Sequence, residues 1–181
     1  MEGKPAPTPF DVMAIGLAVM SCTTVENFLR RAWVTEPVFN GSLDRSQLEQ
    51  KRFQKGFGKS LRELAKWLSH HPKVQALPEK DRTEITSYLD ALVEWRDALC
   101  HGSYSKEQNG NIHLQFYDYQ SWDPAGIPGS NIGPKRKSFP AQELIDLART
   151  NGEALEHFRK LLDIPETATV EAPVTDIGSE L

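Results

Sequence analysis

The chain has 181 residues, of which 39% are hydrophobic, which suits one globular domain with a sizeable core. Its 21 Lys and Arg residues are outnumbered by 25 Asp and Glu residues, so the overall charge does not indicate a nucleic-acid binder, and any anion site must be a local basic patch. The two cysteines, Cys22 and Cys100, are too few for a disulfide framework, and we expect both to be free thiols in buried helices. The N-terminus lacks the layout of a signal peptide, and the apolar run from Val12 to Met20 is too short to cross a bilayer, so we expect a cytoplasmic protein.

Residues 1–9 are rich in proline, and we expect them to be disordered. A first helix is expected to begin either at Asp11 or near Thr8-Pro9 and to run to about Val34, because apolar side chains recur there every three or four residues. The sequence Thr35-Glu36-Pro37 is expected to end it.

The same periodicity predicts four later helical segments: from Ser42 to about Lys55, from about Lys59 to the stop at His70-His71-Pro72, from Pro78 to Gly102, and from Pro140 to about Asp163. Gly56-Phe57-Gly58 separates the first two of these, since two glycines cost about 2 kcal/mol relative to alanine inside a helix. These two segments therefore count as one broken helix.

Between the last two helices the pattern changes from a helical period to alternation. Ile112–Tyr119 alternates and is rich in β-branched and aromatic residues, which is typical of a strand, and Lys135–Phe139 is expected to return as a short second strand. We therefore predict an all-α fold: an up-and-down helical bundle of four main helices over residues 10–163, with a small β-hairpin inserted before the last helix. Residues 164–181 are expected to be a disordered tail.

Arg96 and His101 are the best candidates for chemistry. Arginine offers a fork of donors that matches a phosphate, and histidine can transfer protons near neutral pH. Asp97 lies four residues before His101, close enough to hydrogen-bond the imidazole ring. Arg96 and His101 are separated by about 140° on an ideal helix, so they would meet at one phosphate only if the helix end unwinds or a second subunit supplies the other half of the site. The alternative is structural: Arg96 pairs with Asp97 or Glu94, and His101 is an ordinary helix end.

The stretch Arg96-Asp97-Ala98-Leu99-Cys100-His101-Gly102 resembles the motif of HEPN domains (higher eukaryotes and prokaryotes nucleotide-binding), in which an Arg, a polar residue, three more residues and His-Gly end a bundle helix. The resemblance implies a metal-independent endoribonuclease in which the Arg and His line a cleft between two protomers. It implies that Arg96 stabilises phosphate charge and that His101 transfers protons. Asp97 takes the polar position, which is most often Asn in the family, so it is expected to decide whether the site cuts RNA or only binds.

A basic stretch around the glycine pair is expected to guide RNA, and Lys55, Lys59 and Arg62, together with Tyr104, are the candidate RNA-binding residues. A solvated helix face is the more common explanation of such a stretch. No metal or other cofactor is expected, since the usual zinc-ligand spacings and phosphate-binding loops do not occur in the sequence.

Three functional hypotheses follow. The first is an RNA-cleaving HEPN protein, of the toxin or antiviral-defence type, that works as a homodimer and has an antitoxin or other regulatory protein as partner. The second is a non-catalytic HEPN-like module that binds a nucleotide, a nucleic acid or a protein. The third is a helical regulator in which the pair formed by Arg96 and Asp97 is structural.

Overall fold

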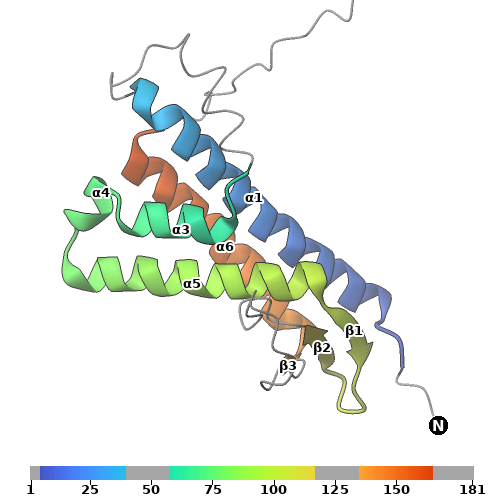
Figure 1. Ribbon diagram of the computed structural model, residues 1–181. Coiled ribbons are helices and arrows are strands. Elements are labelled where there is room, and N and C mark those ends of the chain that lie inside the picture. Colours follow the sequence, from blue (N-terminus) through green and yellow to red (C-terminus); the bar gives the residue numbers. More distant parts are fainter. Residues whose placement is uncertain (1–4, 40–57, 117–134, 165–181) are drawn as a thin grey trace, which may run out of the picture.

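The computed structural model describes residues 5–39, 58–116 and 135–164. Within these ranges the chain is mostly helical and carries one small antiparallel sheet (Figure 1). In chain order the elements are α1 (Pro9–Phe39), α3 (Leu61–Ser69), α4 (Pro72–Gln75), α5 (Glu79–His101), β1 (Ser103–Lys106), β2 (Ile112–Phe116), β3 (Lys135–Phe139) and α6 (Ala141–Leu162). The predicted helix over 42–55 lies outside the described residues.

The start of α1 is fixed by a reciprocal cap. The hydroxyl of Thr8 accepts a hydrogen bond from the Asp11 amide at 3.3 Å, and the Asp11 carboxylate accepts from the Thr8 amide at 2.8 Å. Each side chain thus satisfies a backbone donor that the first turn of a helix leaves unpaired. Of the two predicted starting points, the structure selects Thr8-Pro9, and Asp11 belongs to the first turn rather than to the cap position.

The predicted end of the first helix was wrong, because α1 continues through Pro37 to Phe39. A proline disfavours a helix through local sterics, but tertiary contacts can outweigh that preference. Here the Glu36 carboxylate accepts a hydrogen bond from Nε2 of the buried His71 at 2.8 Å, which holds the last described turns of α1 against the start of α4. That start was also unforeseen: the predicted stop at His70-His71-Pro72 is followed by one more helical turn, α4.

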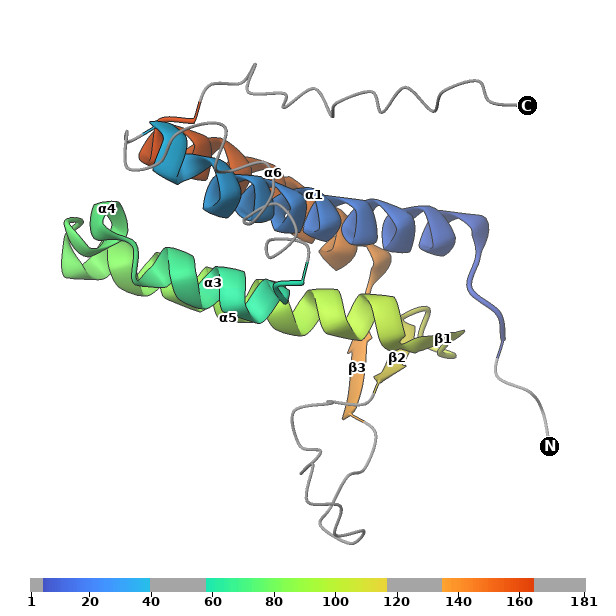
Figure 2. The same ribbon diagram turned by 45° about the horizontal axis from the view of Figure 1, so that its top comes forward.

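The long helices form two pairs that cross in Figure 1 and are seen as two stacked layers in Figure 2. In both views α1 lies alongside α6 and points the same way, while α3 lies alongside α5 and runs in the opposite direction to it. The direction therefore reverses from α3 to α5 and again from α5 to α6, and the segment between α1 and α3 lies outside the described residues. A buried polar network joins the pairs: Asn151 of α6 accepts a hydrogen bond from the Tyr88 hydroxyl of α5 and donates one to the Ser21 hydroxyl of α1, both at 2.9 Å. Around it the core is filled by small and aliphatic side chains and by buried phenylalanines, of which Phe158 packs edge-on against Tyr88.

Over Pro9–Glu36, α1 is long and apolar enough to cross a membrane by length and composition, a property that core helices of soluble proteins share. The sequence prediction had considered only the run from Val12 to Met20. In the structure one face of α1 is buried against the rest of the chain, at Ala14, Ala18, Cys22, Val25, Leu29 and Ala32.

The sheet has three strands in the order β1-β2-β3, so the predicted hairpin of two strands was incomplete. The strands β2 and β3 occur where the sequence pattern placed them, and the predicted residues after Phe116 lie outside the described part of the chain. The missed strand is β1, whose sequence Ser-Tyr-Ser-Lys has no apolar alternation. It pairs with β2 in antiparallel register, with Tyr104 opposite Leu114.

The junction between α5 and β1 is tight. Gly102 follows α5 directly, as predicted, but its backbone is extended (φ −89°, ψ 161°) rather than left-handed. A Cβ there would lie 2.5 Å from the carbonyl oxygen of Ala98, so the position needs glycine for space. Two residues earlier Cys100 is exposed, contrary to the prediction of burial, whereas Cys22 is fully buried and burial raises the pKa of its thiol to about 11.

Candidate functional site

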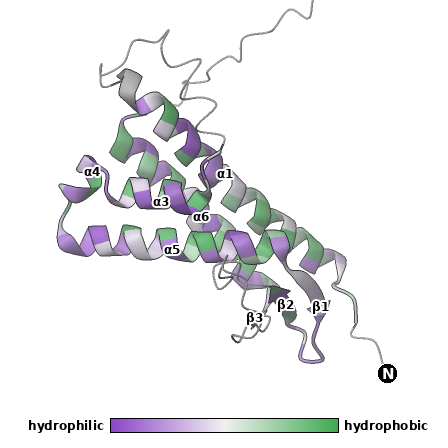
Figure 3. Ribbon diagram, in the orientation of Figure 1, coloured by the Kyte–Doolittle hydropathy of each residue, from purple (hydrophilic) through white to green (hydrophobic). Residues whose placement is uncertain are grey.

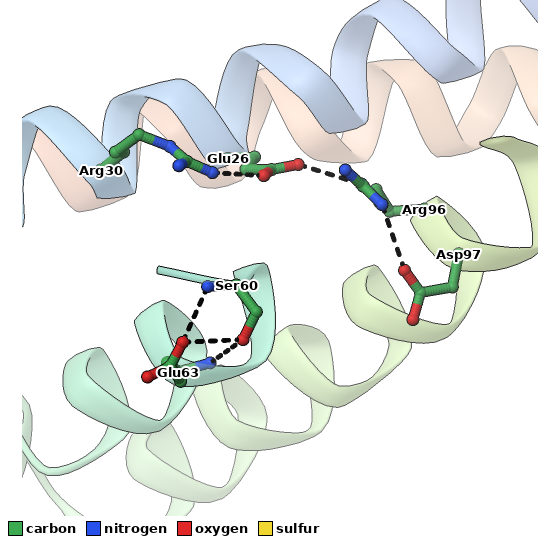
Figure 4. Close-up of polar contacts among 6 residues, drawn as sticks. All are labelled: Glu26, Arg30, Ser60, Glu63, Arg96 and Asp97. Carbon is green, nitrogen blue, oxygen red and sulfur yellow. Dashed lines mark hydrogen bonds and ion pairs between the residues drawn. The ribbon is translucent and has the colours of Figure 1, made fainter. Parts of the chain in front are cut away.

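Arg96 projects from α5 towards α1, where it meets a carboxylate (Figure 4). Its Nε donates a hydrogen bond to Oε2 of Glu26 at 3.0 Å, and its Nη1 donates one to Oδ1 of Asp97 at 3.3 Å. The Arg96 side chain is 29% exposed, so the guanidinium lies at the boundary between the core and solvent. Its Nη2 has no hydrogen-bond partner among the residues that the structure describes.

Glu26 is buried and sits between two arginines. Its other oxygen accepts a hydrogen bond from Arg30 of the same helix at 2.6 Å, and its side chain is only 9% exposed (Figure 4). A buried carboxylate is stable only with such partners, because removing it from water is costly. Two carboxylates, those of Glu26 and Asp97, therefore balance two guanidinium groups, those of Arg30 and Arg96.

The electrostatics keep Arg96 charged. Burial by itself lowers the pKa of Arg96, but the charge and hydrogen bond of Glu26, together with the nearby Asp97 carboxylate, more than offset it, so the pKa of Arg96 is raised. A fixed positive charge with a donor that no described residue occupies is suited to an anionic oxygen such as that of a phosphate.

His101 and Arg96 do not lie on the same side of α5. The helix continues through His101, so the helix end does not unwind between the two residues. Five residues of α-helix turn through about 140° and advance about 7.5 Å, which directs the two side chains apart. Asp97, by contrast, is one turn before His101 on nearly the same face. His101 is exposed at the C-terminal end of α5.

A cleft of about 480 Å³ lies between α3 and α5, beside the sheet. Its α3 wall carries Arg62 and Lys66, and its α5 wall carries Asp90, Glu94 and Asp97. The two walls therefore have opposite charge. Asp97 is the residue shared between this cleft and the cluster around Glu26, since it lines the cleft and also accepts the hydrogen bond of Arg96.

The structure does not bring the predicted RNA-binding residues together. Lys59 lies just before α3, where its ammonium donates to Glu63 at 3.0 Å and lies 5.4 Å from the centre of the Trp33 ring. Arg62 lines the cleft. Tyr104 lies on β1, half-buried, with its hydroxyl donating to the Leu99 carbonyl at the end of α5, and burial raises the pKa of that hydroxyl.

The fourth predicted residue, Lys55, lies outside the described residues. The described basic side chains that adjoin the cleft are instead Arg62 and Lys66 of α3 and Lys135 of β3. The next lysine of that strand, Lys137, is turned to α5: it pairs with Glu94 at 3.0 Å and lies 4.3 Å from the centre of the Trp95 ring.

Sequence reasoning missed Glu26 and Arg30. The signal was present, since Glu26 is an acidic residue inside the buried stripe that contains Val25 and Leu29, and an arginine follows it four residues later. A carboxylate in such a position needs a buried cationic partner. The spacing identifies Arg30 as one partner, but only the packing of α5 on α1 reveals Arg96 as the second.

Among the described residues no group of three or more His, Cys, Asp or Glu side chains is placed to hold a metal ion. The end of α5 carries a charged guanidinium, an imidazole, a carboxylate and the exposed thiol of Cys100. No protein-family model matches the chain, and neither a curated protein nor a solved structure matches it.

Proposed function

We propose that this chain is a metal-independent endoribonuclease of the HEPN type, in which Arg96 and His101 carry the reaction. The observation that supports it is the state of Arg96: a guanidinium that Glu26 holds in its charged form, whose Nη2 makes no hydrogen bond to the described residues, five residues before an exposed histidine. In this proposal Arg96 stabilises the charge on a phosphate. His101 takes the proton of the neighbouring 2′-hydroxyl, which attacks the phosphorus and releases the 5′-oxygen of the next nucleotide.

Asp97 is assigned a positioning role. It lies one helical turn before His101, from where a carboxylate can hold the ring in one tautomer, and it also contacts Arg96. The basic residues Arg62 and Lys66 on the α3 side of the cleft are assigned to the path of the RNA, because they lie across the cleft from Asp97.

Two protomers are needed for this chemistry. Arg96 and His101 diverge within one chain. The proposed active site therefore lies between two protomers, where Arg96 of one protomer meets the partner subunit's His101 across the ends of the two α5 helices. A protein of this kind fits a cytoplasmic toxin or antiviral-defence effector, and an antitoxin or other regulatory protein is then the expected partner.

A second candidate is a non-catalytic HEPN-like module that binds a nucleotide, a nucleic acid or a protein. The specific observation in its favour is that Glu26 and Asp97 both contact Arg96, so that much of its charge is already balanced within the chain. An arginine in this state can fix a helix and contribute one hydrogen bond to a ligand without supporting a transition state.

The test is an RNA cleavage assay in EDTA with the full chain and 5′-labelled single-stranded RNA. The first proposal predicts products ending in a 2′,3′-cyclic phosphate, and a loss of activity of at least about 100-fold in both Arg96→Ala and His101→Ala. The matched controls are Arg149→Ala and His157→Ala, which remove an exposed arginine and an exposed histidine from α6 and should leave cleavage unchanged.

The outcomes separate the candidates. Cleavage that is absent in the wild type, or equal in all four variants, contradicts the endoribonuclease. RNA binding that depends on Arg96 without any cleavage, measured by fluorescence anisotropy with the same RNA, supports the non-catalytic module. Loss of thermal stability in Arg96→Ala together with unchanged RNA binding supports a purely structural role for the arginine.

A further inference from the structure

The N-terminal half of α1 has an apolar stripe that the described chain does not cover. Its members are the four large side chains of Phe10, Met13, Leu17 and Met20, which are 52%, 50%, 43% and 68% exposed. Figure 3 shows hydrophobic segments recurring along this half of α1. Large apolar side chains that are exposed singly are ordinary, but four on one side of one helix form a patch of the kind that marks an interaction site.

The spacing of the stripe is that of a helix-packing seam. Its members are separated by three, four and three residues, so that alternate members are seven residues apart, and all four lie within about 80° of one another around the helix axis. The buried face of α1, which includes Ala14 and Ala18, is a separate stripe. The helix thus has one apolar face that packs within the chain and another that faces solvent.

The stripe is also electrically neutral. From Pro9 to Val25 the only charged side chain of α1 is Asp11, and this carboxylate is buried and paired with Lys106 at 2.6 Å. Two copies of the chain, each with a net charge of −4, can therefore bring these faces together without opposing like charges. Amphipathic helices that bind membrane surfaces usually have Lys or Arg beside the apolar face, and this half of α1 has neither.

We propose that the stripe of Phe10, Met13, Leu17 and Met20 is a self-association surface, on which α1 of a second copy packs in antiparallel orientation. A two-fold axis near the middle of the stripe would bring identical side chains together, which is the usual arrangement in homodimers. Gly16 lies beside the stripe, between Met13 and Met20, and a Cβ placed there would have no atom within 4 Å. The partner helix can approach closely at that point.

The same heptad spacing continues into polar residues. Thr24 and Asn27, both exposed, occupy the next two positions after Met20. A stable interface buries about 800 Å² of surface on each partner, which is more than four half-exposed side chains supply. The proposed interface therefore includes these polar residues and their neighbours as its rim. This arrangement of an apolar centre and a polar edge is typical of protein interfaces.

This surface is separate from the proposed RNA site. Leu17 and Glu26 are nine residues apart, which corresponds to about 180° around α1, so the stripe and the ion pair with Arg96 lie on opposite sides of the helix. Association through the stripe leaves the Arg96 side of α1 open. It is therefore an additional contact between copies, and it does not depend on whether the chain cleaves RNA.

The test compares Leu17→Glu with Ala91→Glu, which introduces the same charge at an exposed position of α5. Sedimentation velocity over a range of concentrations should show that the wild type and Ala91→Glu associate reversibly, and that Leu17→Glu weakens this association by at least about tenfold in Kd. Circular dichroism checks that both variants are folded. Association that is absent in the wild type, or equal in both variants, overturns the proposal.

Cross-linking gives a second measurement, which distinguishes this surface from the proposed active site between the ends of the α5 helices. In a Cys100→Ser background, a short bismaleimide should join two Leu17→Cys chains into a covalent dimer and should leave Ala91→Cys chains monomeric. Dimers formed equally by both would overturn the proposal. A wild type that is monomeric in solution but co-sediments with neutral phosphatidylcholine vesicles would overturn it in favour of a lipid ligand.

Discussion

Arg96 of α5 and Glu26 of α1 form an ion pair that joins two helices across 70 residues of sequence. Because Glu26 is 7% exposed and also holds Arg30, this contact has a structural as well as a chemical consequence. It fixes the guanidinium at the surface between α1 and α5, and it makes the geometry of the candidate site depend on the packing of those two helices.

Glu26→Gln should destabilise the protein by about 2 kcal/mol, because it removes the charged carboxylate that both Arg30 and Arg96 contact, while Arg96 keeps its contact with Asp97. Removing one partner of a fully buried ion pair costs about 3–5 kcal/mol, and here both guanidinium groups are partly exposed. Urea denaturation measures the change. The control is Glu156→Gln, whose side chain is 59% exposed and pairs with Arg159 on the surface, and which should change the free energy of unfolding by less than about 0.5 kcal/mol. Equal effects in the two variants would show that the pair of Glu26 and Arg96 contributes no more than a surface contact.

Gly102→Ala should destabilise by about 2–3 kcal/mol, since its Cβ would overlap the Leu114 side chain and press on the Ala98 carbonyl oxygen, which is part of the helix backbone. Gly152→Ala is the matched control. It lies in α6 with no atom within 4 Å of the added Cβ, so it should stabilise by about 0.5–1 kcal/mol through helix propensity. Thermal unfolding of both variants shows whether each substitution raises or lowers the melting temperature. An unchanged melting temperature in Gly102→Ala would mean that the turn from α5 to β1 can widen to accept the added Cβ.

Asn151→Ala should cost about 2–4 kcal/mol, because it removes the hydrogen bonds of a buried amide, leaves the Tyr88 hydroxyl without its acceptor, and opens a cavity in the core. Tyr88→Phe removes only one donor and should cost about 1 kcal/mol. Asn27→Ala, at an exposed position of α1, serves as the control. If Asn151→Ala is no worse than Tyr88→Phe, the amide does not hold the two helix pairs together.

Asp11→Asn should reduce stability in a way that depends on pH. Burial raises the pKa of this carboxyl, but the Lys106 ammonium and the two Thr8 donors outweigh it and lower the pKa below its ordinary value of about 3.9. A lowered pKa in the folded state means that the contribution of the carboxylate is complete above about pH 4 and is lost as the pH falls through the folded-state value. Urea midpoints of the wild type and Asp11→Asn should therefore differ clearly at pH 6 and differ less at pH 2.5. An equal difference in urea midpoint at pH 6 and pH 2.5 would contradict the lowered pKa of Asp11. The control is Asp163→Asn, whose side chain is 82% exposed and which should change the urea midpoint little at either pH.

Much of the fold follows from local sequence signals, and the differences have identifiable causes. The periodicity located α3, α5 and α6, and the alternation located β2, whose burial alternates in the same way, while β3 was expected only as its return strand. The extension of α1 past Pro37 depends on the contact between Glu36 and His71, which are 35 residues apart. The strand β1 exists because Tyr104 pairs opposite Leu114, and a short polar segment does not reveal such pairing.

The residues of the candidate site could be predicted from the sequence, but the contact that Arg96 makes with another helix could not. The sequence indicated Arg96, Asp97 and His101, and helical geometry indicated that the first and last diverge, which matches the intact end of α5. The partner of Arg96 was expected among its neighbours on α5, Asp97 or Glu94. The structure adds Glu26, which no local rule identifies because the contact depends on how two helices cross.

The hydrogen bond from the Lys106 amide to the Pro5 carbonyl, at 2.8 Å, has a consequence for handling the protein. β1 forms one edge of the sheet, and an uncovered edge is a template for pairing with other chains. The main chain at Pro5, anchored nearby through Asp11 and Lys106, occupies part of that edge. Shortening the chain to begin at α1 would therefore leave a strand edge open to intermolecular pairing, with aggregation as its visible result.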